Sequence, residues 1–263
     1  MRLLNKICAI TGAGSGIGSA AARLFAEEGA CVYILECSAE KGKETEQAIL
    51  KAGKKAMFLQ CDISDEASVD RAFGQIQKTS EKLDVLYNNA SVYLNGRDGI
   101  ISEISTETWN RVIAINLSGM FFCCRRAIPM LIQSGNGAII NTASSAGVTG
   151  IPRCDAYTAT KGAAVSLTRS LAAEYGKYNI RTNCIAPAAI QTEMVKQSNP
   201  DNDFFDETAF LGLRSPLRRW GQPDEVAKLA LFLASDDSSY INGTVIAADG
   251  GITVNGDLAK AGM

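Results

Sequence analysis

The chain contains no histidine. Histidine is the side chain best suited to carry protons near neutral pH, because its unperturbed pKa is about 6.5. Its absence also removes the zinc sites that combine histidine with cysteine. We therefore expect no metal site, and any proton transfer must use a group other than imidazole.

Neither a strong excess of one charge nor a long apolar run is present. The 26 basic and 28 acidic residues give a net charge of −2, which does not favour binding to a nucleic acid. No apolar run approaches the roughly 18 residues that a membrane span needs. Lys6 interrupts the apolar N-terminal stretch, unlike a signal peptide. We expect a cytoplasmic protein with no nucleic-acid or membrane partner.

Cysteine is present eight times, but never in a C-x-x-C pair. Most of these residues lie in apolar runs such as "KICAIT" and "ACVYIL". This pattern is typical of small, reduced core residues and agrees with a reducing compartment. The alternative is a reactive thiol, for which Cys154 is the best candidate because it lies near Tyr157.

Short apolar runs alternate with helical segments along the whole chain. The expected strands are "KICAIT", "CVYILE", "AMFLQ", "DVLYNN", "GAIINTAS", "IRTNCIAP" and "GTVIAAD". Helical stretches separate them, the longest at roughly 106–134 and 155–178. Near-continuous apolar strands between helices predict a parallel sheet that is covered on both faces. The predicted fold is α/β, a doubly wound Rossmann-type domain spanning 1–263.

One irregular stretch, at about 188–215, is unusually long for a compact domain. Loops of this length are often functional. We interpret it as a substrate lid, with a solvated insertion as the alternative.

A glycine-rich loop, "TGAGSGIG", follows the first predicted strand and precedes the first helix. Gly12, Gly16 and Gly18 would let the backbone approach a pyrophosphate, which the helix N-terminus attracts. Many glycine patterns are only tight turns, but a strand before and a helix after favour dinucleotide binding.

The residue that ends the second strand is acidic. Glu36 can accept hydrogen bonds from both hydroxyls of an adenosine ribose and would repel a 2′-phosphate. An NADP site would need a cation nearby, but positions 15 and 37 hold Ser15 and Cys37. The sequence therefore favours NAD, with a solvated strand-end carboxylate as the alternative for Glu36.

Polar residues also follow the third and fourth strands. Asp62 could bind the adenine amino group, or it could cap the next helix, and the sequence does not separate these possibilities. The segment "NNAS", 88–91, ends the fourth strand, where open α/β sheets place their ligand crevice.

The proton-transfer candidates lie in "DAYTATK". Tyr157 and Lys161 are four residues apart, so they share one face of a helix. A nearby cation stabilises a phenolate and lowers the pKa of the tyrosine, and a nicotinamide cation would add to this effect. Alcohol oxidation then needs only a proton acceptor and a hydride acceptor.

Together these motifs resemble one enzyme family. In order they are "TGAGSGIG", "NNAS", "AINLSG", "NTASSAG", "YTATK", "PAAIQT" and "AADGG". Ser144 lies 13 residues before Tyr157 within this ordered set. Over nearly its whole length the chain resembles the short-chain dehydrogenase/reductase family, whose fold is a Rossmann-type domain with a seven-stranded parallel sheet.

The resemblance implies a role for each matching residue. Tyr157 would be the general acid/base, and Lys161 would lower its pKa and hold the nicotinamide ribose. Ser144 would orient the substrate oxygen, and Asn116 would hold a water that links Lys161 to solvent. The implied residues that contact NAD are Gly12, Ser15, Gly16, Ile17, Gly18, Glu36, Asp62, Ile63, Asn89, Ala90, Tyr157, Lys161, Pro187, Ile190 and Thr192.

Two positions depart from the family pattern. Ala188 stands after Pro187 and Ser91 follows "NNA", where the family usually has glycine. We expect the methyl group of Ala188 to alter the local conformation of the loop at 188–192.

The sequence says less about the substrate. Contacts are expected from 92–95, from 147–154 and from the lid, whose apolar residues are Met194, Phe204, Phe205, Phe210 and Leu211. Arg153 is the single candidate for an anionic handle. We therefore expect a small alcohol or ketone, neutral or apolar, cyclic compounds included.

Two other functions remain open at this point. One is a 3-oxoacyl-carrier-protein reductase, an activity that usually uses NADPH. The other is an NAD-binding regulator without turnover. The resemblance also implies a homotetramer, with a dimer possible, through the helices at 106–134 and 155–178.

Overall fold

The computed structural model describes residues 1–194 and 215–254. Within them a seven-stranded parallel sheet has the order β3-β2-β1-β4-β5-β6-β7. Its strands are β1 (Ile7–Thr11), β2 (Cys31–Glu36), β3 (Lys55–Gln60), β4 (Val85–Asn88), β5 (Gly137–Thr142), β6 (Ile180–Pro187) and β7 (Val245–Ala248). The strand order reverses between β1 and β4. The predicted doubly wound Rossmann-type fold is thus confirmed.

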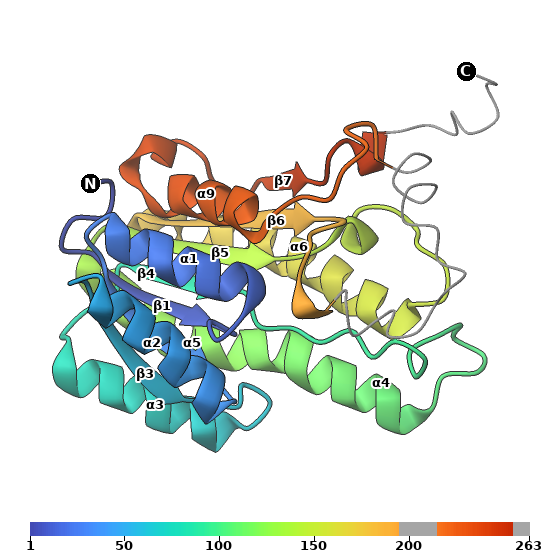
Figure 1. Cartoon of the computed structure of the whole chain (residues 1–263), viewed down its shortest axis with the longest axis horizontal. Coiled ribbons are helices and arrows are strands. Elements are labelled where there is room, and N and C mark those ends of the chain that lie inside the picture. Colours follow the sequence, from blue (N-terminus) through green and yellow to red (C-terminus); the bar gives the residue numbers. More distant parts are fainter. Residues whose placement is uncertain (195–214, 255–263) are drawn as a thin grey trace.

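Helices cover both faces of this sheet (Figure 1). On one face α1 (Gly16–Glu27) lies beside α9 (Pro223–Ala234), with α2 (Ala39–Lys51) next to α1. On the other lie α3 (Glu66–Thr79), α5 (Gly119–Ser134) and α6 (Asp155–Tyr175). Neighbouring strand residues such as Ala9 and Ile10 belong to opposite cores. This follows from the two-residue period of a strand, and it explains why the buried strands read as continuous apolar runs.

The helical stretch predicted at 106–134 is present but interrupted. It consists of α4 (Thr106–Ile113), a π-helical turn (Ala114–Ser118) and α5. By length and composition this stretch could cross a membrane, but half of its most apolar window is buried inside the fold. It packs against α3, α6 and the sheet, which identifies it as a core helix here.

Candidate active site

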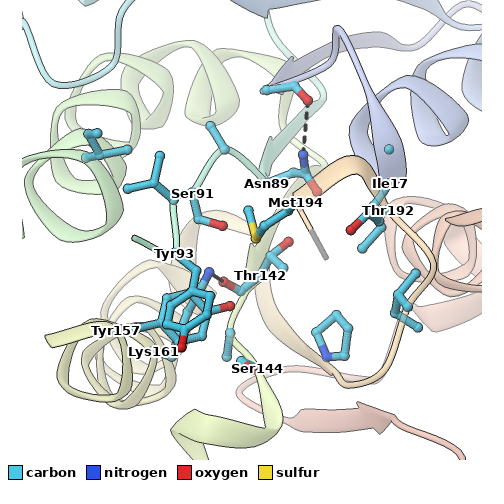
Figure 2. A pocket seen from close by; sticks show the side chains of 18 of the residues that line it. Ile17, Asn89, Ser91, Tyr93, Thr142, Ser144, Tyr157, Lys161, Thr192 and Met194 are labelled. Carbon is cyan, nitrogen blue, oxygen red and sulfur yellow. Dashed lines mark hydrogen bonds between the residues drawn. The ribbon is translucent and has the colours of Figure 1, made fainter. Parts of the chain in front are cut away.

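A cavity of about 720 Å³ lies at the carboxyl ends of the strands. Its wall includes residues at or just beyond strand ends, such as Glu36, Asn89, Thr142 and Pro187. Ligand crevices of open α/β sheets occur at this edge, next to the point where the strand order reverses. Figure 2 shows Tyr93, Tyr157 and Lys161 gathered on one side of the cavity, with Ile17 and Thr192 across it.

Most of the residues predicted from the sequence meet in this cavity. Those in its wall are Gly12, Ser15, Gly16, Ile17, Glu36, Asp62, Ile63, Asn89, Ala90, Ser144, Tyr157, Lys161, Pro187, Ile190 and Thr192. Gly18 and Asn116 do not line the cavity but contact residues that do: Gly18 packs against Gly12, and Asn116 hydrogen-bonds to Val92.

The glycine loop is packed tightly against its neighbours, and backbone atoms exclude a side chain at Gly12 and Gly18. A Cβ atom at Gly18 would lie 2.2 Å from the carbonyl oxygen of Gly12. Gly12 itself has φ +63°, and a Cβ there would lie 2.8 Å from the Cα of Ala90. Any larger residue would therefore displace the loop from the end of β4, so these glycines are required by the backbone packing.

The helix that follows this loop begins without a cap. Ser15 precedes α1, but its side chain makes no capping hydrogen bond, and the first turn holds no acidic residue. By contrast, α2, α3 and α4 are capped: the side chains of Ser38, Asp65 and Ser105 accept hydrogen bonds from amides in the first turn of each helix. The first N–H groups of α1 are therefore left for an anionic ligand in the cavity, which the helix dipole attracts.

The Glu36 carboxylate is held at the cofactor end of the cavity. One oxygen accepts a hydrogen bond from the Gly14 amide at 3.1 Å, and the other accepts one from the Ser38 amide at 3.0 Å. The Cys37 thiol donates to the same carboxylate at 3.2 Å. Glu36 is therefore a fixed acceptor in the wall of the cavity rather than a freely solvated carboxylate.

The two possibilities for Asp62 are now separated. Helix α3 is capped by Asp65, whose carboxylate accepts from the Ala67 amide at 3.0 Å. Asp62 instead accepts from the amide and hydroxyl of Ser64 at 2.9 and 2.7 Å and lines the cavity. The helix-cap alternative is wrong, and Asp62 is a carboxylate in the cavity wall whose contact with adenine stays a prediction.

Thr11, the last residue of β1, has a structural role that its sequence does not reveal. Its hydroxyl accepts hydrogen bonds from the amides of Asn89 and Ala90, both at 3.0 Å. The Asn89 side chain returns hydrogen bonds to the carbonyls of Thr11 and Gly12. These bonds join the ends of β1 and β4, and nothing in the local sequence distinguishes this threonine from a cap or a turn residue.

Tyr157 projects from the first turn of α6 into the cavity. Burial raises the pKa of its phenol to about 12, while a hydrogen bond with the Ser144 side chain lowers it. The pKa of Tyr157 is therefore raised, not lowered, in the protein by itself, because burial has the largest effect. The lowering expected from Lys161 together with a nicotinamide cation stays a prediction. Tyr93 packs against Tyr157 with 5.4 Å between the ring centroids.

Lys161 lies one turn along the same helix, as predicted. Its ammonium group donates to the Thr142 carbonyl at 2.8 Å and lies 5.4 Å from the centre of the Tyr157 ring. Only 3% of the residue is exposed, and burial lowers the pKa of its amine to about 8. No carboxylate among the described residues pairs with it, so added negative charge in the cavity would be strongly attracted.

Asn116 lies in the π-helical turn between α4 and α5. Its amide accepts from the Val92 N–H at 2.8 Å and donates to the Val92 carbonyl at 2.9 Å. It also donates to the Thr160 hydroxyl at 3.2 Å. Asn116 thus fixes the loop after β4 against α6, and the water predicted to lie beside it stays a prediction.

Apolar and aromatic side chains form part of the cavity wall. They include Val92, Tyr93, Ile151, Pro152, Cys154, Met194 and Trp220, and Tyr93 is the one that packs on the Tyr157 ring. Arg153, the candidate anionic handle, is exposed and is not part of the wall. Phe204, Phe205, Phe210 and Leu211 of the predicted lid lie outside the described residues.

In the loop at 188–192, the backbone strain lies at Ala189 and not at Ala188. The left-handed residue is Ala189, with φ +50°, whereas Ala188 does not have a positive φ. A left-handed conformation is unfavourable for alanine. The loop therefore holds a strained residue two positions after Pro187, in the wall of the cavity.

The cysteines behave mainly as core residues. Cys8, Cys61, Cys123, Cys124, Cys154 and Cys184 are buried, Cys31 is partly buried and Cys37 is exposed. None forms a disulfide. Burial raises the pKa of the Cys154 thiol, which keeps it protonated and does not support the reactive-thiol alternative.

Comparison with known proteins agrees with this geometry. A family model described as "Enoyl-(Acyl carrier protein) reductase" matches residues 12–253. The chain is 37% identical to a meso-2,3-butanediol dehydrogenase of Serratia marcescens over 99% of both chains. It is 38% identical to a 3-oxoacyl-[acyl-carrier-protein] reductase of Chlamydia trachomatis over 95% of this chain and 98% of that one.

Solved structures share the fold as well. A crystal structure of levodione reductase superposes with a TM-score of 0.92 at 34% identity, covering 97% of this chain and all of that one. A short-chain type dehydrogenase/reductase from Mycobacterium marinum superposes with a TM-score of 0.87 at 31% identity, covering 96% and 97% of the two chains.

Proposed function

Since the chain belongs to the short-chain dehydrogenase/reductase family and is an oxidoreductase with a nicotinamide cofactor site, we propose that it is an NAD-dependent alcohol dehydrogenase. It would interconvert a secondary alcohol and a ketone, with Tyr157 as the general acid/base. The observation that carries this proposal is the joint arrangement of Ser144, Tyr157 and Lys161 in one cavity with a glycine loop and an uncapped helix N-terminus.

The residues present fit a dinucleotide. The open N-terminus of α1 and the closely packed loop at Gly12 and Gly18 suit a pyrophosphate. The two carboxylate oxygens of Glu36 suit the two hydroxyls of an adenosine ribose. Because a carboxylate fixed there would repel a 2′-phosphate, the geometry supports NAD over NADP. A bound nicotinamide would supply the hydride acceptor for alcohol oxidation.

The chain itself would manage the proton. Ser144 would hold the substrate oxygen next to the Tyr157 phenol, which would accept the alcohol proton. With burial raising the Tyr157 pKa to about 12, proton transfer near neutral pH needs added positive charge. Lys161 and the cofactor cation together would provide it. Asn116 would hold the Val92 backbone in place, and the Thr142 carbonyl would hold the Lys161 ammonium group.

The substrate end supports a neutral compound. Its wall includes many apolar and aromatic side chains, and Arg153 is exposed and does not line it. We propose a compact secondary alcohol without a charged group, cyclic alcohols included. Two relatives, a meso-2,3-butanediol dehydrogenase and a levodione reductase, are named for small alcohol and ketone substrates, which supports this proposal.

A second candidate is a 3-oxoacyl-carrier-protein reductase. It is favoured by two relatives of that name, each 38% identical to this chain. Glu36 argues against it, because that activity usually uses NADPH. A regulator that binds NAD without turnover is less attractive, since Ser144, Tyr157 and Lys161 are all present and assembled.

We also propose a homotetramer, with a dimer as the alternative, in the cytoplasm. The exposed Phe121 on α5 is consistent with an oligomer interface. The absence of disulfides among the eight cysteines is consistent with a cytoplasmic protein. Sedimentation that shows a stable monomer would overturn the proposed oligomer.

The decisive experiment is a panel of alcohols and ketones with NAD(H) and NADP(H), followed by cofactor absorbance. We expect turnover of a neutral secondary alcohol with NAD. Turnover confined to acyl thioesters with NADPH would support the reductase, and NAD binding without turnover of any compound would support the regulator.

A further inference from the structure

Helix α6, which carries Tyr157, begins in an unusual way. Its N-cap residue is Cys154, whose side chain makes no capping hydrogen bond. The loop after β4 supplies the missing acceptors instead. Gly99 and Asp98 of that loop lie more than 50 residues earlier in the chain.

The first three amides of α6 are all bound by this loop. The Asp155 amide donates to the Gly99 carbonyl at 3.1 Å. The Ala156 amide donates to one Asp98 carboxylate oxygen at 3.1 Å, and the Tyr157 amide donates to the other at 2.9 Å. Asp98 therefore caps the helix at the backbone of Tyr157 itself.

Asp98 is buried, with 6% of its surface exposed. Its third hydrogen bond comes from the Gly99 amide at 2.9 Å. No cation among the described residues forms an ion pair with it. Backbone amides and the positive end of the helix dipole thus balance its charge, an arrangement that depends on the helix start being in place.

The same loop carries Tyr93, which packs against Tyr157. A tight turn links Tyr93 to Asp98, which caps α6. In this turn the Asp98 amide donates to the Leu94 carbonyl at 2.7 Å. In return, the Asp155 carboxylate accepts from the Ile101 amide at 2.8 Å. The loop and the first turn of α6 are therefore bonded to each other in both directions.

We propose that Asp98 is a positioning residue for the reaction. It holds the backbone of Tyr157, and through the turn at 94–98 it holds the Tyr93 ring, so that the phenol stays aimed at Ser144. This inference rests on the proposed function, because it assigns to Asp98 a part in the chemistry of Tyr157.

A matched control is available in Asp84. This aspartate is also buried, with 2% exposed, and also accepts from a backbone amide, that of Ile7 at 2.7 Å. It lies just before β4 at the opposite edge of the sheet, away from the cavity. Unlike Asp98, Asp84 also pairs with the Lys82 ammonium group at 3.0 Å. Asp84→Asn therefore removes a buried carboxylate charge without affecting the start of α6.

The experiment compares Asp98→Asn and Asp98→Ala with Asp84→Asn. For each variant we would measure thermal stability, the Kd for NADH and kcat at saturating substrate and cofactor. We expect Asp98→Ala to lower kcat by about 30- to 100-fold, since a displacement of about 1 Å can cost ~10²-fold. Asp98→Asn keeps one acceptor oxygen and should lose less activity. The Kd for NADH should stay within about threefold.

Asp84→Asn should lower stability but leave kcat within about twofold once corrected for folded protein. Equal losses of kcat in Asp98→Asn and Asp84→Asn at equal stability would overturn the proposal. So would an Asp98→Asn variant that retains full kcat. If Asp98→Ala does not fold, Asp98→Asn decides the question.

Failure of the proposed function would look different. The wild-type enzyme would then bind NADH without turning over any alcohol or ketone. Hydrogen exchange would still test whether Asp98 holds the start of α6. Loss of this cap should accelerate exchange at the amides of 155–158 in Asp98→Asn but not in Asp84→Asn. Unchanged exchange there would contradict the proposal independently of activity.

Discussion

Helices α1 and α6 both begin at the cavity, but the first amides of α1 are uncapped whereas those of α6 are capped by the protein. At α1 the N-cap residue Ser15 makes no side-chain hydrogen bond, which leaves its first amides for a ligand. At α6 a buried carboxylate, Asp98, already occupies the amides of Ala156 and Tyr157. Both termini attract negative charge. One therefore remains available to an anionic cofactor, while the other is filled by the protein and fixes the residue proposed to transfer the proton.

This difference separates binding from chemistry within one cavity. An anionic group is attracted at the α1 end, whereas the α6 end carries a carboxylate and an apolar wall. The arrangement accounts for our proposal of a charged cofactor and a neutral substrate. The following predictions test whether the two ends can be disturbed independently.

The largest effect is expected from Lys161→Met. Loss of the ammonium group removes the cation that stabilises the Tyr157 phenolate, so kcat should fall by about 10³-fold, or ~4 kcal/mol of barrier. Steady-state kinetics at saturating NAD would measure it. A variant with more than a tenth of wild-type kcat would show that Lys161 is not needed for the proton transfer.

A smaller effect, confined to the α1 end, is expected from Glu36→Gln. The neutral amide would no longer repel a 2′-phosphate, and it can accept through one oxygen only. The preference for NAD over NADP, as a ratio of kcat/KM, should fall by about 30-fold, or ~2 kcal/mol. The proposal of NAD specificity would be lost if the wild type already used NADP as well as NAD.

Lys161→Met should also change stability, in the direction opposite to its effect on activity. Burial lowers the pKa of Lys161 to about 8, so its charged form costs free energy in the folded state. Between pH 8 and 10.5 the unfolded chain binds more protons, so this group makes stability rise with pH. Below that window the full penalty, about 3 kcal/mol, applies.

The variant should therefore be more stable than the wild type at pH 7, by about 1–2 kcal/mol after loss of the bond to the Thr142 carbonyl. The gain should shrink towards pH 10. Denaturant unfolding at both pH values measures this difference, and a Lys161→Met protein less stable than the wild type at pH 7 would contradict it.

The smallest effect is expected at Ala189. Glycine adopts its left-handed conformation without strain, so Ala189→Gly should raise the free energy of unfolding by about 0.5–1 kcal/mol. Ala188→Gly is the matched control and should lower stability by a similar amount, because Ala188 has no positive φ. Thermal unfolding of both variants tests this. An Ala189→Gly protein that is no more stable than the wild type would show that the strain is not at Ala189.

The same comparison of helix starts explains what the sequence could predict. The open start of α1 is encoded within eight consecutive residues, 11–18, and Glu36 stands at the end of the next strand. The period of the apolar runs likewise predicts the sheet. These signals are local, so a single sequence reveals them without any knowledge of the fold.

The closed start of α6 is not local. Asp98 lies in a loop with no motif, and its partners Ala156 and Tyr157 follow 58 and 59 residues later. Thr11 is similar, because its amide partners Asn89 and Ala90 follow β4, 78 and 79 residues later in the chain. The pKa of Tyr157 also depends on how deeply the phenol is buried, which spacing along a helix does not reveal.

The most direct test of the central claim is Tyr157→Phe, studied in parallel for cofactor binding and turnover. The substitution keeps the ring that packs against Tyr93 and removes only the phenolic hydroxyl. We predict an unchanged Kd for NADH and a kcat at least 10³-fold lower, which is ~4 kcal/mol of barrier. Near-normal turnover in this variant would contradict the account, because the proton would then have to leave by a group other than Tyr157.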